Sequence, residues 1–246
     1  MISTSLKPAA ELIRRPLTLL PDATTIEHYV RLFAETTFLG NMANSLIVAC
    51  GAVILGLGLA VPASYAFSRF KFAGRRVLLQ FLVINMFPVV LLIIPLFILM
   101  RQLGLLDTYL ALIIGHGTFT MPFAVWMMAS YMQAIPTELD DAAMIDGCSR
   151  LGALWRVVIP LALPGIVTTG IYIFITSWNE YLYALMLAGH DVRTLTVALQ
   201  LLIGEFDIQW DMLTAGGTVT ALPVTILFLF IQKRLVGGLT AGAVRT

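Results

Sequence analysis

The sequence predicts an all-α, polytopic helical membrane protein with five membrane spans. Hydrophobic residues make up 59% of the 246 residues and charged residues only 12%, far from the balance of soluble globular domains. Five mostly apolar runs reach the length of about 20 residues that a helix needs to cross a bilayer. Each run must be helical, because an open strand edge in lipid would leave backbone hydrogen-bonding groups unpaired.

The five predicted spans share a mostly apolar composition and occupy residues 45–67, 77–100, 110–132, 164–187 and 213–231. They predict an extracytoplasmic N-terminal segment at 1–43 and a transmembrane domain at 44–235, which includes a polar loop at 133–163. A C-terminal tail follows at 236–246. No cleavable signal peptide is expected, because the first 20 residues lack a compact apolar core behind a basic cap.

Small residues recur every four positions in the first span, at Ala52, Gly56 and Ala60. Such spacing predicts close contact with another membrane helix.

Positive charge near the span ends sets the predicted orientation. The stretch "SRFKFAGRR" at 68–76 carries four basic residues and no acid, Arg69, Lys71, Arg75 and Arg76, which is typical of a cytoplasmic loop. Alternation then places the 133–163 loop and the C-terminal tail inside the cell, and the 188–212 loop outside. Five spans also place residues 1–43 outside, an unusual position for a segment with four positive charges, Lys7, Arg14, Arg15 and Arg31.

The polar loop, "IPTELDDAAMIDGCSRLGALWRVVIPLALPG" at 135–165, predicts two short helices. Thr137 can cap the first, and three acids stand at the positive end of its dipole, Glu138, Asp140 and Asp141. Gly147 suits the left-handed position that ends such a helix, and Ser149 can cap the second. An apolar stripe is expected on the second helix at Leu151, Leu154, Trp155 and Val158.

The first loop helix has two readings. Leu139, Ala142 and Ala143 share one face, and the two alanines would let another backbone approach closely. One reading is a helix lying on the membrane surface. The other is a docking site for a protein partner, which the acidic residues favour because surface-lying helices are usually basic.

The loop resembles a family signature. "DDAAMIDG", then nine residues, then "VVIP" is similar to the cytoplasmic loop of inner-membrane permeases in binding-protein-dependent ATP-binding-cassette importers. That signature reads Glu-Ala-Ala, two residues, Asp-Gly, nine residues, Ile, any residue, Leu-Pro; here Asp141, Val157 and Ile159 replace its Glu, Ile and Leu. The stretches "SWNEYLYAL" and "LPVTILFLFIQKRLVGGLTAGAVRT" further resemble the carbohydrate-uptake permeases related to the maltose system.

The resemblance implies the ABC importer permease fold with six spans, and we expect the five predicted spans to correspond to the last five of these, with the first missing. It implies a heterodimer with a second permease subunit, two cytoplasmic ATPase subunits that bind ATP and Mg, and an extracytoplasmic sugar-binding protein. It also implies that residues 136–160 form coupling helices that dock on the ATPase. The implied coupling residues are Glu138, Asp141, Ala142, Ala143, Asp146, Gly147 and Pro160.

Polar groups inside spans are candidates for the sugar path, because they are costly to expose to lipid. The strongest set is Trp178, Asn179, Glu180, Tyr181 and Tyr183. Trp and Tyr can stack on sugar faces, while Asn and Glu can hydrogen-bond hydroxyls. The same residue types also mark membrane interfaces or bridge helices. Asn85 and His116 are weaker candidates.

Other function classes fit less well. None of the three lysines follows a G-x-x-x-x-G spacing, so the chain encodes no phosphate-binding loop and we expect no cofactor in it. An ion-driven secondary transporter would need paired carboxylates in the membrane, and only Glu180 lies within a predicted span. A membrane enzyme would need a catalytic or metal-binding cluster, but the histidines are scattered, at His28, His116 and His190. A net charge of +1 argues against nucleic acid.

Overall fold

The computed structural model describes residues 1–12, 18–70, 88–204 and 208–242, and every regular element within these ranges is a helix. Contacts divide the chain into two compact units, one of residues 1–44 with 194–246 and one of residues 45–193. Three described helices are long and apolar enough to cross a membrane, α4 (Phe38–Arg69), α7 (Tyr109–Gln133) and residues 210–229 of α14 (Trp210–Gly242). The all-α prediction is confirmed, and these helices contain three of the predicted spans.

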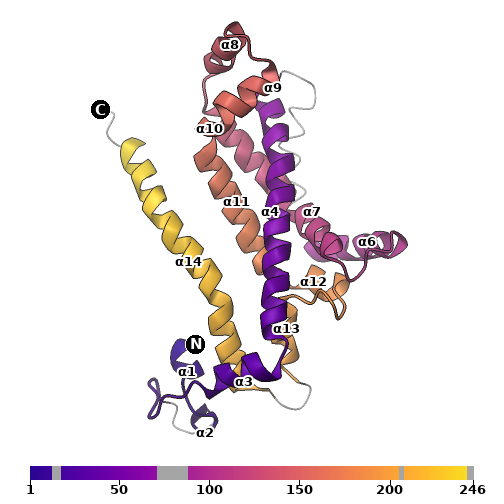
Figure 1. The fold of residues 1–246 in the computed structure, drawn as a ribbon, viewed down its shortest axis with the longest axis vertical. Coiled ribbons are helices and arrows are strands. Elements are labelled where there is room, and N and C mark those ends of the chain that lie inside the picture. Colours follow the sequence, from indigo (N-terminus) through magenta and orange to yellow (C-terminus); the bar gives the residue numbers. More distant parts are fainter. Residues whose placement is uncertain (13–17, 71–87, 205–207, 243–246) are drawn as a thin grey trace. The chain divides into compact units, whose positions relative to one another are not determined.

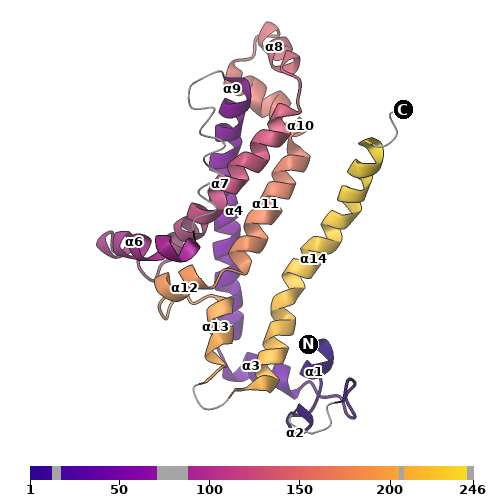
Figure 2. The same ribbon diagram turned by 180° about the vertical axis from the view of Figure 1, so that it is seen from behind.

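In the 45–193 unit, α4 and α7 lie beside α11 (Leu163–Trp178) in both views (Figures 1 and 2). Buried residues of the three helices form one core, which includes Ala52, Ala60, Ala124, Met128 and Ile173. A Cβ atom added at Gly56 would come within 2.7 Å of Cδ1 of Ile173. The small residues of the first span therefore allow α11 to approach closely, as predicted.

The fourth predicted span is not one helix. α11 ends at Trp178, and the short helix α12 (Leu182–Leu187) follows it. Before α11, the helical segment Arg150–Leu161 meets it at a bend of 78°, and by length and composition the two pieces together match either a broken span or a re-entrant loop. The prediction of a continuous helix at 164–187 was wrong because a polar cap interrupts it, as described below.

The second predicted span is described only in part. α6 (Val89–Gln102) is a shorter apolar helix, and α12 packs against both it and α7. Asn85 and three basic residues of the predicted cytoplasmic loop, Lys71, Arg75 and Arg76, lie outside the described residues. The count of five spans therefore stays a prediction.

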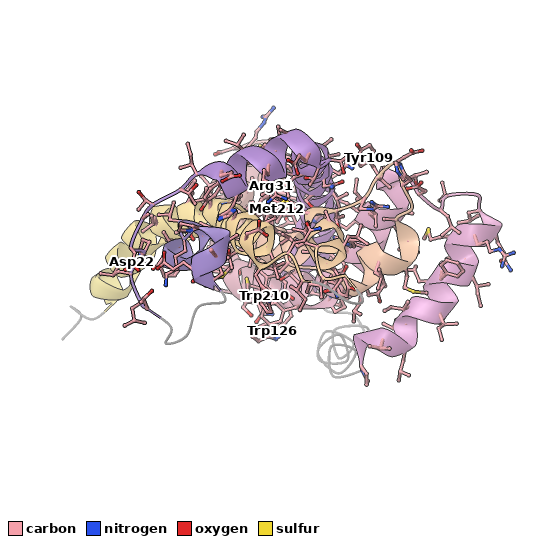
Figure 3. The ribbon with its side chains drawn as sticks, turned by 90° about the horizontal axis from the view of Figure 1, so that it is seen from below. Asp22, Arg31, Tyr109, Trp126, Trp210 and Met212 are labelled. Carbon is pink, nitrogen blue, oxygen red and sulfur yellow. The ribbon has the colours of Figure 1, made fainter. Side chains whose placement is uncertain are left out.

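The other unit gathers α1 (Ile2–Ser5), α2 (Ala9–Leu12) and α3 (Glu27–Glu35) against α14, together with α13 (Leu195–Leu201). Nη1 of Arg31 lies 3.0 Å from Oδ2 of Asp211, and Figure 3 labels Arg31 together with Met212, the residue that follows Asp211 in α14. Nζ of Lys7 lies 3.6 Å from Oε1 of Glu11. Two basic residues of the N-terminal segment thus have acidic partners. α14 runs to Gly242, past the predicted start of the tail at 236, and the three-part division stays a prediction.

Candidate functional site

The polar loop folds into helices near the positions that its local signals predict. α8 (Glu138–Ile145) is followed by Gly147 at φ +85°, and α9 (Arg150–Ala153) begins where Oγ of Ser149 accepts a hydrogen bond from the Gly152 N–H at 3.1 Å. Both predictions are confirmed. The predicted side-chain cap at Thr137 was wrong, because its φ of −68° and ψ of −24° are helical rather than the extended values of a capping residue.

Most predicted coupling residues face outward. All except Ala143 are exposed, namely Glu138, Asp141, Ala142, Asp146, Gly147 and Pro160. The same surface carries large apolar side chains, with Ile145 87% exposed, Leu151 67% and Trp155 68%. In Figure 1, α8 and α9 lie at one end of the 45–193 unit. The loop therefore offers a mixed acidic and apolar surface of the kind that suits a protein partner.

The predicted single stripe of the second loop helix was wrong. Leu154 and Val158 are buried, whereas Leu151 and Trp155 are exposed. Residues Leu154–Val158 form a π-helical turn, η2, which joins α9 to α10 (Ile159–Leu161). A π-helical turn holds more residues than an α-helical turn, so the stripe is divided between an inner and an outer face.

Asp140 points inward, unlike the acids on either side of it. Its Oδ1 accepts a hydrogen bond from Oη of Tyr65 at 2.7 Å, and its Oδ2 lies 2.9 Å from Nε of Arg69. Nη1 of Arg69 also donates to the carbonyl of Met132, at 3.1 Å. Asp140 does stand in the first turn of α8, as predicted, but its side chain faces α4 and not the solvent. The signal that could have found it is Arg69, which follows the first predicted span on the same predicted side of the membrane.

The predicted sugar-path set surrounds the break between α11 and α12. The carboxylate of Glu180 accepts hydrogen bonds from the backbone N–H groups of Tyr183 and Ala184, both at 3.0 Å. Nε2 of His116 lies 3.4 Å from Oε2 of Glu180, and its Nδ1 lies 2.6 Å from Oγ of Ser177. Glu180, two residues before α12, thus caps the first turn of that helix and meets α7 through His116, which explains why the apolar run is broken here.

The aromatic members of this set differ in exposure. Trp178 is buried and stacks on Phe174, with ring centroids 5.8 Å apart. Tyr183 is also buried, and its hydroxyl has no hydrogen-bond partner among the described residues. Asn179 is exposed and Tyr181 is half-buried. Asn179 and Tyr181 are therefore the members that a ligand can reach directly, while the Tyr183 hydroxyl is a buried polar group that lacks compensation.

A further polar centre, which the sequence reasoning missed, lies in the loop between α6 and α7. The Asp107 carboxylate accepts hydrogen bonds from the backbone N–H groups of Gly189, His190, Asp191 and Val192, at 2.7 to 3.3 Å. Burial opposes its ionisation, but these four donors outweigh burial and hold the pKa of Asp107 below its usual range. No sequence signal connects residues so far apart in the chain.

Comparisons with known proteins agree with this architecture. A family model described as "Binding-protein-dependent transport system inner membrane component" matches residues 52–240. The chain is 39% identical to the sulfoquinovosyl glycerol transport system permease protein SmoH of Agrobacterium fabrum, over 100% of this chain and 87% of that protein. It is 35% identical to the trehalose/maltose transport system permease protein MalG of Thermococcus litoralis, over 90% of this chain and 82% of that protein.

Among solved structures, the chain resembles a bacterial ABC transporter involved in the import of the acidic polysaccharide alginate. The TM-score is 0.82 at 27% identity, over 94% of this chain and 87% of that one. The importer-permease fold predicted from the sequence is confirmed, and the relatives named above are transport permeases rather than enzymes. The loop, the helix core and these matches together show that the chain belongs to the family of binding-protein-dependent transport system inner membrane components.

Proposed function

We propose that this chain is a membrane-spanning permease subunit of an ATP-driven sugar importer. It forms half of the translocation path with a second permease subunit. An extracytoplasmic binding protein delivers the sugar, and two cytoplasmic ATPase subunits bind ATP and Mg. We infer that the substrate is a sugar because two relatives that match nearly the whole chain are named as permeases for sulfoquinovosyl glycerol and for trehalose and maltose. The alternative of an ion-driven secondary transporter finds no support among these relatives.

One observation carries the coupling role. The helices that carry the exposed surface, α8, α9 and η2, are followed directly in the chain by α10. After the 78° bend, α10 is followed by α11. A partner that docks on this surface therefore has a direct connection to a membrane helix that ends at the candidate sugar path. When the ATPase subunits close, the loop moves with them as a rigid element and tilts α11, a rigid-body switch between two packed states.

Three contacts are consistent with the proposed orientation. Arg69 and Asp140 belong to loops that alternation assigns to the cytoplasm, and they form an ion pair. Arg31 and Asp211 belong to segments assigned to the outside, and they also form an ion pair. Asp107 likewise binds a loop assigned to its own side, at residues 189–192. The basic residues of the 68–76 stretch then indicate which of the two sides is the cytoplasm.

At the sugar path, we assign direct contact to Asn179 and Tyr181, which are accessible. Trp178 and Tyr183 shape the site from behind, because both are buried. Glu180 acts indirectly, because its carboxylate caps α12 and so fixes the direction of this short helix beside the sugar path.

The test is co-purification of the ATPase with the tagged permease pair. Trp155→Ala removes the largest exposed apolar side chain of the loop and is expected to lower ATPase recovery by about ten-fold, as loss of an interface hot spot does. Trp210→Ala is the matched control, because Trp210 is also exposed but begins α14. Equal ATPase recovery from both variants would contradict the proposed docking surface.

A further inference from the structure

We infer that the buried cluster of Asp140, Arg69 and Tyr65, called here the Asp140 cluster, transmits ATPase-driven motion from the loop to α4. The inference rests on the proposed function, because it assumes that α8 docks the ATPase. It assigns a second route into the membrane, distinct from the covalent route through α11. The three residues act as positioning residues rather than as contacts with the ATPase, since both charged side chains are nearly excluded from solvent, at 5% for Arg69 and 7% for Asp140.

The geometry of the cluster fixes both the orientation and the position of the Asp140 carboxylate relative to α4. Each carboxylate oxygen of Asp140 has its own partner from α4, Oδ1 at 2.7 Å from Tyr65 Oη and Oδ2 at 2.9 Å from Arg69 Nε. A carboxylate held at both oxygens cannot rotate or slide in the way that an apolar contact can. Displacement of α8 must therefore move the cytoplasmic end of α4 or break two buried polar contacts.

The cluster also reaches the other elements that meet at this end of the unit. Arg69 donates to the Met132 carbonyl in the last turn of α7, and Tyr65 Oη lies 3.5 Å from the carbonyl of Arg150, where α9 begins. One group of side chains thus touches α4, α7, α8 and α9. Arg69 stands at the C-terminal end of α4, where the helix dipole favours a cation.

Stability alone does not account for such a pair. A buried ion pair adds little net stability over an apolar contact of the same volume, yet it is strongly directional. The other two acids in the first turn of α8, Glu138 and Asp141, are exposed and are left for the partner. α8 therefore presents an outer face for docking and one inward carboxylate for attachment to α4.

The experiment uses a reporter on α4 itself. Cys50 is exposed on this helix, so a Cys148→Ser chain can carry an environment-sensitive fluorophore there, in the complex of both permeases and the ATPase. When the Asp140 cluster is unaltered, adding ATP should change the fluorescence of the probe on Cys50. Asp140→Asn and Arg69→Gln should each reduce that change by about ten-fold while the ATPase stays attached, and the double variant should be no worse than either. Ser68→Ala, one residue from Arg69, is the control that keeps the change.

The contrary outcomes are distinct. A full fluorescence change in both single variants, or effects that multiply in the double variant, would overturn the inference and leave the proposed function standing. Failure of the proposed function would differ, because the ATPase would then not co-purify with the unaltered chain. If the single variants do not assemble, Tyr65→Phe decides, since it removes one hydrogen bond and keeps the ion pair. A fall of about two- to five-fold supports the inference, and no change overturns it.

Discussion

Gly147 offers the sharpest perturbation of the coupling loop. It ends α8 at φ +85°, and a Cβ atom built there meets no other atom within 4 Å. Gly147→Ala therefore adds backbone strain without a steric clash. Holding a residue with a Cβ in the left-handed region costs roughly 1–2 kcal/mol, so relaxation of the loop should lower the fraction that can dock by about 5- to 30-fold.

The assay is titration of the ATPase onto the tagged permease pair, with the apparent Kd as the result. Gly104→Ala is the matched control, because Gly104 has φ +66° and equally open surroundings but lies between α6 and α7. We expect Gly147→Ala to weaken ATPase binding by the factor above, Gly104→Ala to leave it unchanged, and Gly147→Asp to abolish attachment and transport. Equal Kd values for the two alanine variants would refute the reasoning.

Three further predictions concern other parts of the 45–193 unit. Asp107→Asn should raise amide hydrogen exchange at 189–192 by about ten-fold. Because the folded pKa of Asp107 is lowered, protection by its carboxylate should be complete above the ordinary pKa of about 3.9 and be lost as the pH falls through the folded value. Asn179→Ala should impair sugar uptake while the complex still assembles, and normal uptake kinetics would remove Asn179 from the path. Gly56→Leu should destabilise by about 1–3 kcal/mol through overpacking against α11, measured as a lower Tm, whereas Gly58→Leu, in open space, should not.

Local signals in the sequence predicted the loop well. The left-handed glycine and the serine cap were both correct, because each depends on residues within one or two turns. The threonine cap failed because the choice between Thr137 as a cap and as a helical residue depends on how the loop leaves α7. Small residues at four-residue spacing likewise predicted the close approach of α11, since Gly56 leaves room for Ile173.

Pairings between distant residues were not predicted from local patterns. Local patterns place Asp140 with Glu138 and Asp141 in the first turn of α8, and only the fold brings Arg69, 71 residues earlier, against it. The Asp107 site depends on loops 82 to 85 residues away. Hydropathy alone also hid the break after Trp178, because Asn179 and Glu180 form only a short polar interruption in an apolar run. The role of Glu180 as the cap of α12 requires the backbone direction that His116 and α7 help to set.

The measurement that tests the central claim most directly is thiol labelling of Cys148 with a membrane-impermeant maleimide. A Cys50→Ser background leaves Cys148, in the turn between α8 and α9, as the sole thiol. In sealed vesicles of known orientation, labelling should occur from the cytoplasmic face and should fall when the ATPase is bound. Labelling from the outer face, or labelling that the bound ATPase leaves unchanged, would contradict a cytoplasmic docking loop.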